Sequence, residues 1–256
     1  METNEPMFLS EEEFAKDFLN NNNNYTFYMN ESVSEKFTRD FAHDDFRQDA
    51  NGNIIHKTAT ISHNVKLGIG NYIGAYCYLV DCKIGNGNRF EAHCSIGTPP
   101  EYKSHFAEGD WNEVEIGNDN VIREFVTINA GTARKTIIGN KNWLLKGSHV
   151  GHDAWVQNEC TLSCNSLIGG HSIIMDGVNM GLASVCHQFS VLGAYSMYGM
   201  GAIVTKKLDA EPFKIFVGNP AVYLKTNSVA IERNNITQQM IDNYIAKYKL
   251  YKNGGL

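Results

Sequence analysis

The chain has 256 residues, of which 43% are hydrophobic and 20% charged, an ordinary composition for one substantial globular domain with small appendages. Its net charge of −6 and pI near 5.8 argue against nucleic acid or an anionic membrane as the main partner, because phosphate binding needs clustered Lys and Arg. The six cysteines form no CxxC pair, which argues against a zinc ribbon and predicts free thiols.

The sequence also lacks the signals of export and membrane insertion. The first residues, METNEPMFLSEEEF, contain no basic segment followed by an apolar run, so we expect no signal peptide. No window approaches the roughly 18 uninterrupted apolar residues of a membrane span. Together with the free thiols, this predicts a cytoplasmic protein.

Residues 1–53 are expected to form an appendage that is partly helical. Ser10 and Glu13 have the spacing of a capping box, and Phe14, Phe18 and Leu19 then share one face of a helix. A run of asparagines over residues 20–24 would end that helix.

From about Ile55 onward the chain divides into hexads such as TISHNV, KLGIGN and YIGAYC. Val, Ile or Leu usually occupies the second position, and Gly, Asn or Asp follows soon after. Three hexads make one triangular coil of about 18 residues, with the aliphatic residue inside and the Gly, Asn or Asp at a corner. The pattern predicts an all-β fold, a left-handed parallel β-helix over residues 54–220. A β-sandwich fits poorly, because its turns recur about every 8–12 residues.

Two kinds of interruption break this repeat. Residues 101–113, EYKSHFAEGDWNE, are out of phase and too polar for a coil, so we expect a loop extruded from the prism. Long loops on a rigid scaffold often carry binding function. Shorter slips near Asp81 and near 133–135 indicate small insertions at corners.

After the exit sequence Gly218-Asn219-Pro220, residues 221–256 are expected to form a helical segment. Asn235 and Gln238 are candidate capping residues. The apolar residues that follow recur at helical spacing and predict an amphipathic helix packed on the prism or on a neighbouring subunit. They are Ile236, Met240, Ile241, Tyr244, Ile245 and Tyr248.

The stretch GSHVGHD, residues 147–153, concentrates the candidate chemistry. One coil after His152 and Asp153 come Gly170 and His171, so the fold predicts that these pairs are neighbours in adjacent coils. A histidine base beside an exposed glycine N–H suits acyl transfer from a thioester, which needs a proton acceptor and a donor for the oxyanion. Our main interpretation is therefore that His152 is a general base and that Asp153 orients its ring.

Two other classes of function remain open. Some β-helix trimers bind zinc between subunits through three histidines, and His149, His152 and His171 could converge in a site of the γ-type carbonic anhydrase kind. A non-catalytic scaffold is the other alternative. We expect no metal, because Asp153 is better placed to orient a base than to act as a fourth ligand.

A longer set of motifs resembles the UDP-N-acetylglucosamine O-acyltransferases of the lipid A pathway. The similar stretches run in order from about His56 to Tyr251 and include SIGTPPEYK, VEIGNDNVIREFVTINAGT, SHVGHDAWVQNECTLS, LIGGHSIIMDG, VCHQFSVLGAYSMYGMGA and VGNPA. The resemblance implies that His152 is the general base, Asp153 its partner and Gly170 the donor to the thioester carbonyl. It also implies substrate contacts from His149, His171, His187, Gln188, Glu101, Lys103, Asn227 and Arg233.

The resemblance further implies a homotrimer that uses acyl-ACP or acyl-CoA as co-substrate and binds no cofactor. The chain departs from the family pattern at Pro220, where the family has His, and at Asn234, where it has Arg. Its C-terminal helical segment is shorter, and residues 1–53 have no counterpart. A coenzyme A-dependent N-acyltransferase acting on another nucleotide-linked amino sugar, for O-antigen or glycan synthesis, therefore stays open beside O-acylation.

Overall fold

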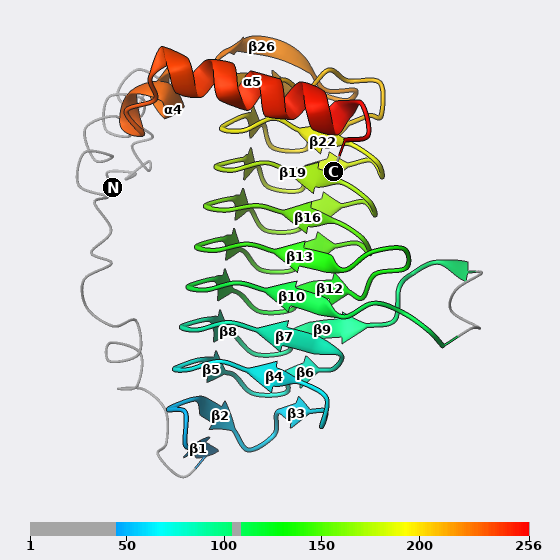
Figure 1. Cartoon of the computed structure of the whole chain (residues 1–256), viewed down its shortest axis with the longest axis vertical. Coiled ribbons are helices and arrows are strands. Elements are labelled where there is room, and N and C mark those ends of the chain that lie inside the picture. Colours follow the sequence, from blue (N-terminus) through cyan, green and yellow to red (C-terminus); the bar gives the residue numbers. More distant parts are fainter. Residues whose placement is uncertain (1–44, 104–108, 256) are drawn as a thin grey trace, which may run out of the picture. The chain divides into compact units, whose positions relative to one another are not determined.

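A computed structural model describes residues 45–103 and 109–255 of the chain. The helix expected around Ser10 lies outside these residues. Over the described part the chain winds into a left-handed parallel β-helix, a three-sided prism with one short strand per side in each coil (Figure 1). The fold predicted from the hexads is confirmed.

Each side of the prism is one sheet. The first sheet contains β1 (Phe46–Gln48), β2 (Ile54–His56), β5 (Tyr72–Ile73), β8 (Arg89–Phe90), β11 (Val121–Ile122), β14 (Trp143–Leu144), β17 (Thr161–Leu162), β20 (Asn179–Met180), β23 (Met197–Tyr198), β25 (Lys214–Val217) and β26 (Val222–Thr226). The second contains β3 (Thr60–Ile61), β6 (Tyr78–Leu79), β9 (Ser95–Thr98), β12 (Thr127–Asn129), β15 (His149–Val150), β18 (Leu167–Ile168), β21 (Val185–Cys186) and β24 (Ile203–Val204). The third contains β4 (Lys66–Leu67), β7 (Cys82–Ile84), β10 (Val114–Ile116), β13 (Thr136–Ile138), β16 (Trp155–Val156), β19 (Ile173–Ile174) and β22 (Val191–Leu192).

The core is a set of columns formed by the second residue of each hexad. In the first sheet Ile73, Phe90, Ile122 and Leu144 stack coil on coil, and all four are fully buried. Burial of one such side chain stabilises the fold by about 1.5–3 kcal/mol. Because a single coil has nothing to cover its aliphatic face, this stabilisation depends on stacking.

Register shows where the coils depart from the regular length. Trp155 pairs with Ile173, one regular coil later. By contrast Cys82 pairs with Val114, so that coil is fourteen residues longer, and the extra chain leaves the prism between β9 and β10 (Figure 1). Val114 pairs with Thr136, so the next coil is four residues longer. The expected insertions near 101–113 and 133–135 are both present. The one expected near Asp81 is wrong: Lys66 pairs with Lys83, so that coil is one residue shorter than a regular one.

The two ends of the prism differ from the sequence expectation in detail. β1 is antiparallel to β2, within the segment expected to be an appendage, and β26 is antiparallel to β25, within the segment expected to be helical. Two helices follow, α4 (Ser228–Arg233) and α5 (Gln238–Lys252). Thr237 caps α5 by accepting a hydrogen bond from the N–H of Met240, so the cap is not Asn235, which has a φ of 50°.

Helix α5 covers the end of the prism nearest the C-terminus (Figure 1). Tyr248 is 2% exposed and joins Ile173 and Val191 of the third sheet in a second hydrophobic cluster. Met240, expected on this face, is instead 36% exposed. Of the two placements expected for this helix, the structure shows packing on the prism. No described helix is both long and apolar enough to cross a membrane.

Candidate functional site

The residues singled out by register lie together at one corner of the prism, between the second and third sheets. We call residues 151–154 and 169–172 the histidine corner. The N–H of His171 donates to the carbonyl of His152 over 2.9 Å, so the two coils stack here as expected. Asp153 and His171 both have φ near +60°, the left-handed conformation that lets the chain turn at this point.

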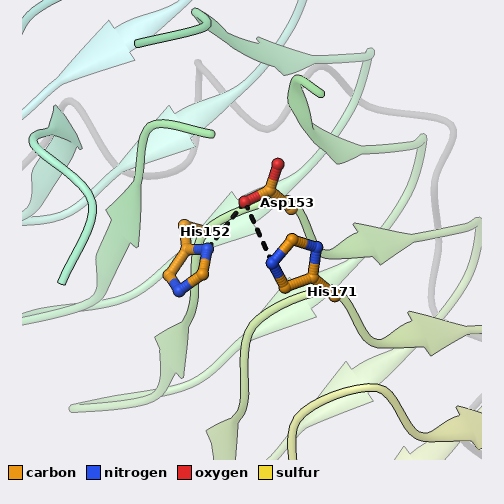
Figure 2. A group of neighbouring side chains, drawn as sticks. All are labelled: His152, Asp153 and His171. Atoms are coloured by element: carbon orange, nitrogen blue, oxygen red, sulfur yellow. Dashed lines mark hydrogen bonds and ion pairs between the residues drawn. The ribbon is translucent and has the colours of Figure 1, made fainter. Parts of the chain in front are cut away.

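His152 and Asp153 form a hydrogen-bonded pair (Figure 2). The His152 Nδ1 atom lies 2.6 Å from Asp153 Oδ2, and the two side chains are 11% and 0% exposed. A buried carboxylate beside an imidazole fixes the ring's orientation and favours its charged form.

A turn over residues 132–134 surrounds the Asp153 carboxylate with donors. Oδ1 accepts from the N–H groups of Ala133 and Arg134, both over 2.7 Å, and from that of Thr132 over 3.0 Å. Oδ2 accepts from the Thr132 hydroxyl over 2.8 Å. Burial raises the pKa of Asp153, but hydrogen bonds from His152, Thr132 and Arg134 together lower it by more. The pKa of Asp153 therefore lies well below its ordinary value.

An ionised carboxylate can only accept hydrogen bonds, so Nδ1 of His152 must carry the proton. The Nε2 atom then has a free lone pair, and no hydrogen bond to it occurs among residues 45–103 and 109–255. It lies over Gly170, where an added Cβ atom would be 2.8 Å from both Nε2 and Cε1. Glycine at this position is what allows the ring to approach.

Gly170 is buried, not exposed as expected, and its N–H has no protein acceptor within the described part of the chain. A base and a free backbone donor therefore lie side by side, as acyl transfer requires.

His171 is the second histidine of this corner. Its Nε2 lies 3.6 Å from Asp153 Oδ2 (Figure 2), and its ring stacks on Phe189 with centroids 4.5 Å apart. Burial lowers the pKa of His171, and the Asp153 charge offsets this only in part. His171 is thus suited to act as a neutral hydrogen-bonding group at neutral pH.

One ligand atom from each of His152, Asp153 and His171 lies within 4.8 Å of the other two, so the chemistry of a metal site has to be considered. The oxygens of Asp153 already accept from three backbone N–H groups, a hydroxyl and an imidazole. Coordination of a cation would require breaking part of this set, whereas an acid–base pair uses it as it stands.

His149 lies on β15, one strand before the corner. Its Nδ1 is 2.7 Å from the Thr127 hydroxyl, and burial lowers its pKa against the raising effect of the Glu101 carboxylate. Glu101 and Lys103 are exposed at the start of the extruded loop, and between them the Tyr102 ring lies 5.8 Å from that of His152. The base of the loop therefore reaches the histidine corner of the same chain.

The other expected contacts are less closely grouped. His187 and Gln188 are exposed one coil above the corner, with His187 Nδ1 2.8 Å from the Gln188 carbonyl. Asn227 is the N-cap of α4, and its amide donates to the Tyr195 carbonyl over 2.9 Å, at a different corner. Arg233 ends α4 and is exposed. Within one chain, the structure does not bring Asn227 and Arg233 to His152.

Sequence reasoning missed Thr132, Arg134, Tyr102 and Phe189. The position of Phe189 could have been predicted from the coil register, because Phe189 follows His171 by one coil. The turn that carries Thr132 and Arg134 was visible only as a slip in the repeat, with no sign that it surrounds Asp153.

No protein-family model matches the sequence. Among curated proteins, an acyl-[acyl-carrier-protein]–UDP-N-acetylglucosamine O-acyltransferase from Stenotrophomonas maltophilia is 37% identical over 179 residues, 67% of this chain and 65% of that protein. This chain thus spans slightly less than two thirds of that relative. A protein of the same name from Herminiimonas arsenicoxydans is 32% identical over 77% of this chain and 82% of its own length.

A solved structure agrees with these relatives. The UDP-N-acetylglucosamine O-acyltransferase of Moraxella catarrhalis superposes with a TM-score of 0.63 at 29% identity, over 79% of this chain and 86% of that one. Identity and coverage together show the relationship, and the chain belongs to the family of UDP-N-acetylglucosamine O-acyltransferases.

Proposed function

We propose that this protein transfers an acyl group from a thioester to a UDP-linked amino sugar, with His152 as general base. The observation that carries the proposal is the position of His152 Nε2 over Gly170, beside a carboxylate held in its charged form. Neither Nε2 nor the Gly170 N–H has a hydrogen-bond partner among the described residues. Family membership gives the reaction class its support.

In this mechanism Nε2 takes the proton of the acceptor hydroxyl or amine while the acceptor atom attacks the thioester carbonyl. The developing oxyanion receives a hydrogen bond from the Gly170 N–H. The imidazolium, stabilised by Asp153, then returns the proton to the sulfur as the carbon–sulfur bond breaks. The products are the acylated sugar and the free thiol.

The names of the relatives supply the substrate proposal: UDP-N-acetylglucosamine as acceptor and an acyl-acyl carrier protein as donor. We assign His149 and His171 to substrate contacts because they interact with His152. We add Glu101 and Lys103 because they flank Tyr102, whose ring lies 5.8 Å from that of His152. His187 and Gln188, one coil above, extend this surface.

Asn227 and Arg233 can contact the substrate only if the protein assembles into an oligomer. They lie away from His152 within one chain, so contact with substrate at this corner requires them from a neighbouring subunit. A cyclic homotrimer would supply such a neighbour to every site and leave no open end. The free thiols of all six cysteines suit a cytoplasmic location.

The test is mass spectrometry of products from a panel of UDP-sugars, each with acyl-ACP and acyl-CoA donors of several lengths. An O-acylated UDP-N-acetylglucosamine formed from acyl-ACP is the expected result. An N-acylated product formed from acyl-CoA would establish the alternative reaction. Carbon dioxide hydration by a zinc-containing protein, with no acyl transfer, would overturn the proposal.

A further inference from the structure

The four-residue lengthening of one coil lies directly against Asp153. In a coil of regular length, Lys135 would stack below Asp153, but the turn over 132–134 occupies this place and directs its N–H groups at the carboxylate. At the same corner one and two coils higher, His171 and Phe189 have the same left-handed φ, and their coils carry no such insertion. Among Asp153, His171 and Phe189, the extra residues therefore lie against the carboxylate.

The conformation of this turn is fixed by a glycine and by hydrogen bonds from Arg134. A Cβ atom on Gly131 would lie 1.7 Å from the carbonyl oxygen of Arg134, so the chain can close here only on glycine. Arg134 secures the far side: its Nε donates to the Asp153 carbonyl over 2.7 Å and its Nη2 to the His171 carbonyl over 3.4 Å. One guanidinium thus ties together the coils that carry the two histidines.

We propose that this turn is a positioning device for the reaction, in which Thr132 and Arg134 hold the Asp153 carboxylate charged and fixed so that His152 keeps its proton on Nδ1. The inference rests on the proposed function, because it assigns roles relative to His152 as base. Thr132 and Arg134 act through Asp153 and touch neither reacting atom.

The turn also places donors and a positive charge beside the carboxylate that His152 shares. The Thr132 hydroxyl donates to Oδ2, the oxygen that His152 shares, and so withdraws negative charge from the atom that stabilises the imidazolium. Arg134 adds a positive charge that lowers the pKa of His171 and opposes a further positive charge at this corner. Loss of either one should favour protonation of His152. Within the described part of the chain, the charged and titratable groups that interact with His152 are Asp153, His149, His171 and Tyr102. Arg134 acts on the neighbouring His171 and donates to the Asp153 backbone carbonyl.

The test is the pH profile of kcat/KM for Thr132→Val, Thr132→Ser, Arg134→Met and Arg134→Lys. In Thr132→Val the acid limb should move up by about 0.5–1 pH unit, and kcat above the limb should fall by about 3–10-fold, with KM little changed. Thr132→Ser keeps the hydroxyl and should restore the wild-type limb. Arg134→Met should move the limb upward, whereas Arg134→Lys should leave it in place.

Thr161→Val is the matched control, because Thr161 is a partly buried threonine on β17 of the first sheet. The Thr161→Val variant should have the same acid limb in its pH profile of kcat/KM, and the same kcat, as the wild type. A folded Thr132→Val enzyme with wild-type limb and kcat overturns the inference. If that variant does not fold, nitrogen-15 NMR of the wild-type imidazole decides: protonated Nδ1 at His152 supports the inference, and protonated Nε2 overturns it.

Failure of the proposed function gives a different signature. It would appear as wild-type protein without acyl transfer, or as His152→Ala with normal kcat. Loss of activity in His152→Ala together with unchanged Thr132 and Arg134 variants would remove the positioning role alone.

Discussion

Two corners of the same prism use polar residues in opposite ways. Between the third and first sheets runs an asparagine ladder, formed by Asn53, Asn71, Asn88, Asn120 and Asn142. Each Oδ1 accepts the N–H of the asparagine one coil on, over 2.7–3.0 Å, up to Asn142, which accepts from Cys160. The amide groups donate to carbonyls of adjacent coils, so the ladder satisfies itself along the axis.

The histidine corner is built differently. At this corner an inserted turn donates the hydrogen bonds to the carboxylate, while His152 Nε2 and the Gly170 N–H have no hydrogen-bond partner among the described residues. Buried polar groups that satisfy one another stabilise a fold, and polar groups left free at a fixed separation can act on a substrate. The comparison therefore separates a structural corner from a chemical one, although both come from the same hexad.

The largest expected effect is on catalysis at the histidine corner. His152→Ala should lower kcat by about 10²–10⁴, the range for loss of general base catalysis, with little change in KM or thermal stability. Steady-state kinetics with the substrates identified by mass spectrometry measure this. His63→Ala, at an exposed histidine of an early coil, is the control and should keep wild-type kcat.

Gly170→Ala should give a smaller catalytic loss. The added methyl group would meet the His152 ring at 2.8 Å and displace it, and a shift of this size is expected to lower kcat by about 10–100-fold. Gly199→Ala is a matched control, because its Cβ would meet Val217 Cγ1 at 2.9 Å, away from the histidine corner. Equal kcat in the two variants would show that Gly170 has no special role.

The asparagine ladder should respond in stability and not in chemistry. Asn88→Ala removes the acceptor for Asn120 and the donor to the Gly117 carbonyl, so we expect the free energy of unfolding to fall by about 2–4 kcal/mol. Denaturant unfolding measures the loss, and kcat per folded molecule should not change. Asn179→Ala, on the exposed outer face of β20, should leave both quantities unaltered.

The smallest effect is a pH dependence of stability. Burial lowers the pKa values of His149 and His171 below the ordinary 6.5, so the unfolded chain binds protons that the folded chain does not. Stability should therefore decline as pH falls through 6.5 and level off below the folded pKa values. Replacing both residues with Gln should flatten this region of the unfolding curve; an unchanged slope would show that other groups cause it.

The regular part of the molecule was predictable because its physics is repetitive. One aliphatic residue per hexad specifies the buried columns, and equal coil length places Gly170 over His152 and His171 over Asp153. Tertiary contacts decided the rest. The turn around Asp153 appeared only as a break in the repeat, and nothing in that break indicated where its N–H groups point.

The ends of the prism show the same limit. Asn235 has the residue type of a helix cap, yet Thr237 provides it, because Asn235 adopts a left-handed φ at the bend before α5. The position of α5 follows from burial of Tyr248 on the third sheet, which spacing along the helix does not specify. Local patterns locate elements, but packing between elements sets their bounds.

The measurement that tests the central claim most directly is the pH dependence of kcat/KM for wild type and His152→Ala, with a verified acceptor and donor. If His152 is the base, wild-type kcat/KM should rise with pH through a single ionisation in the range of a histidine. That limb should disappear in His152→Ala, leaving a low and flat profile. A variant that retains both the limb and near-normal kcat would contradict the account.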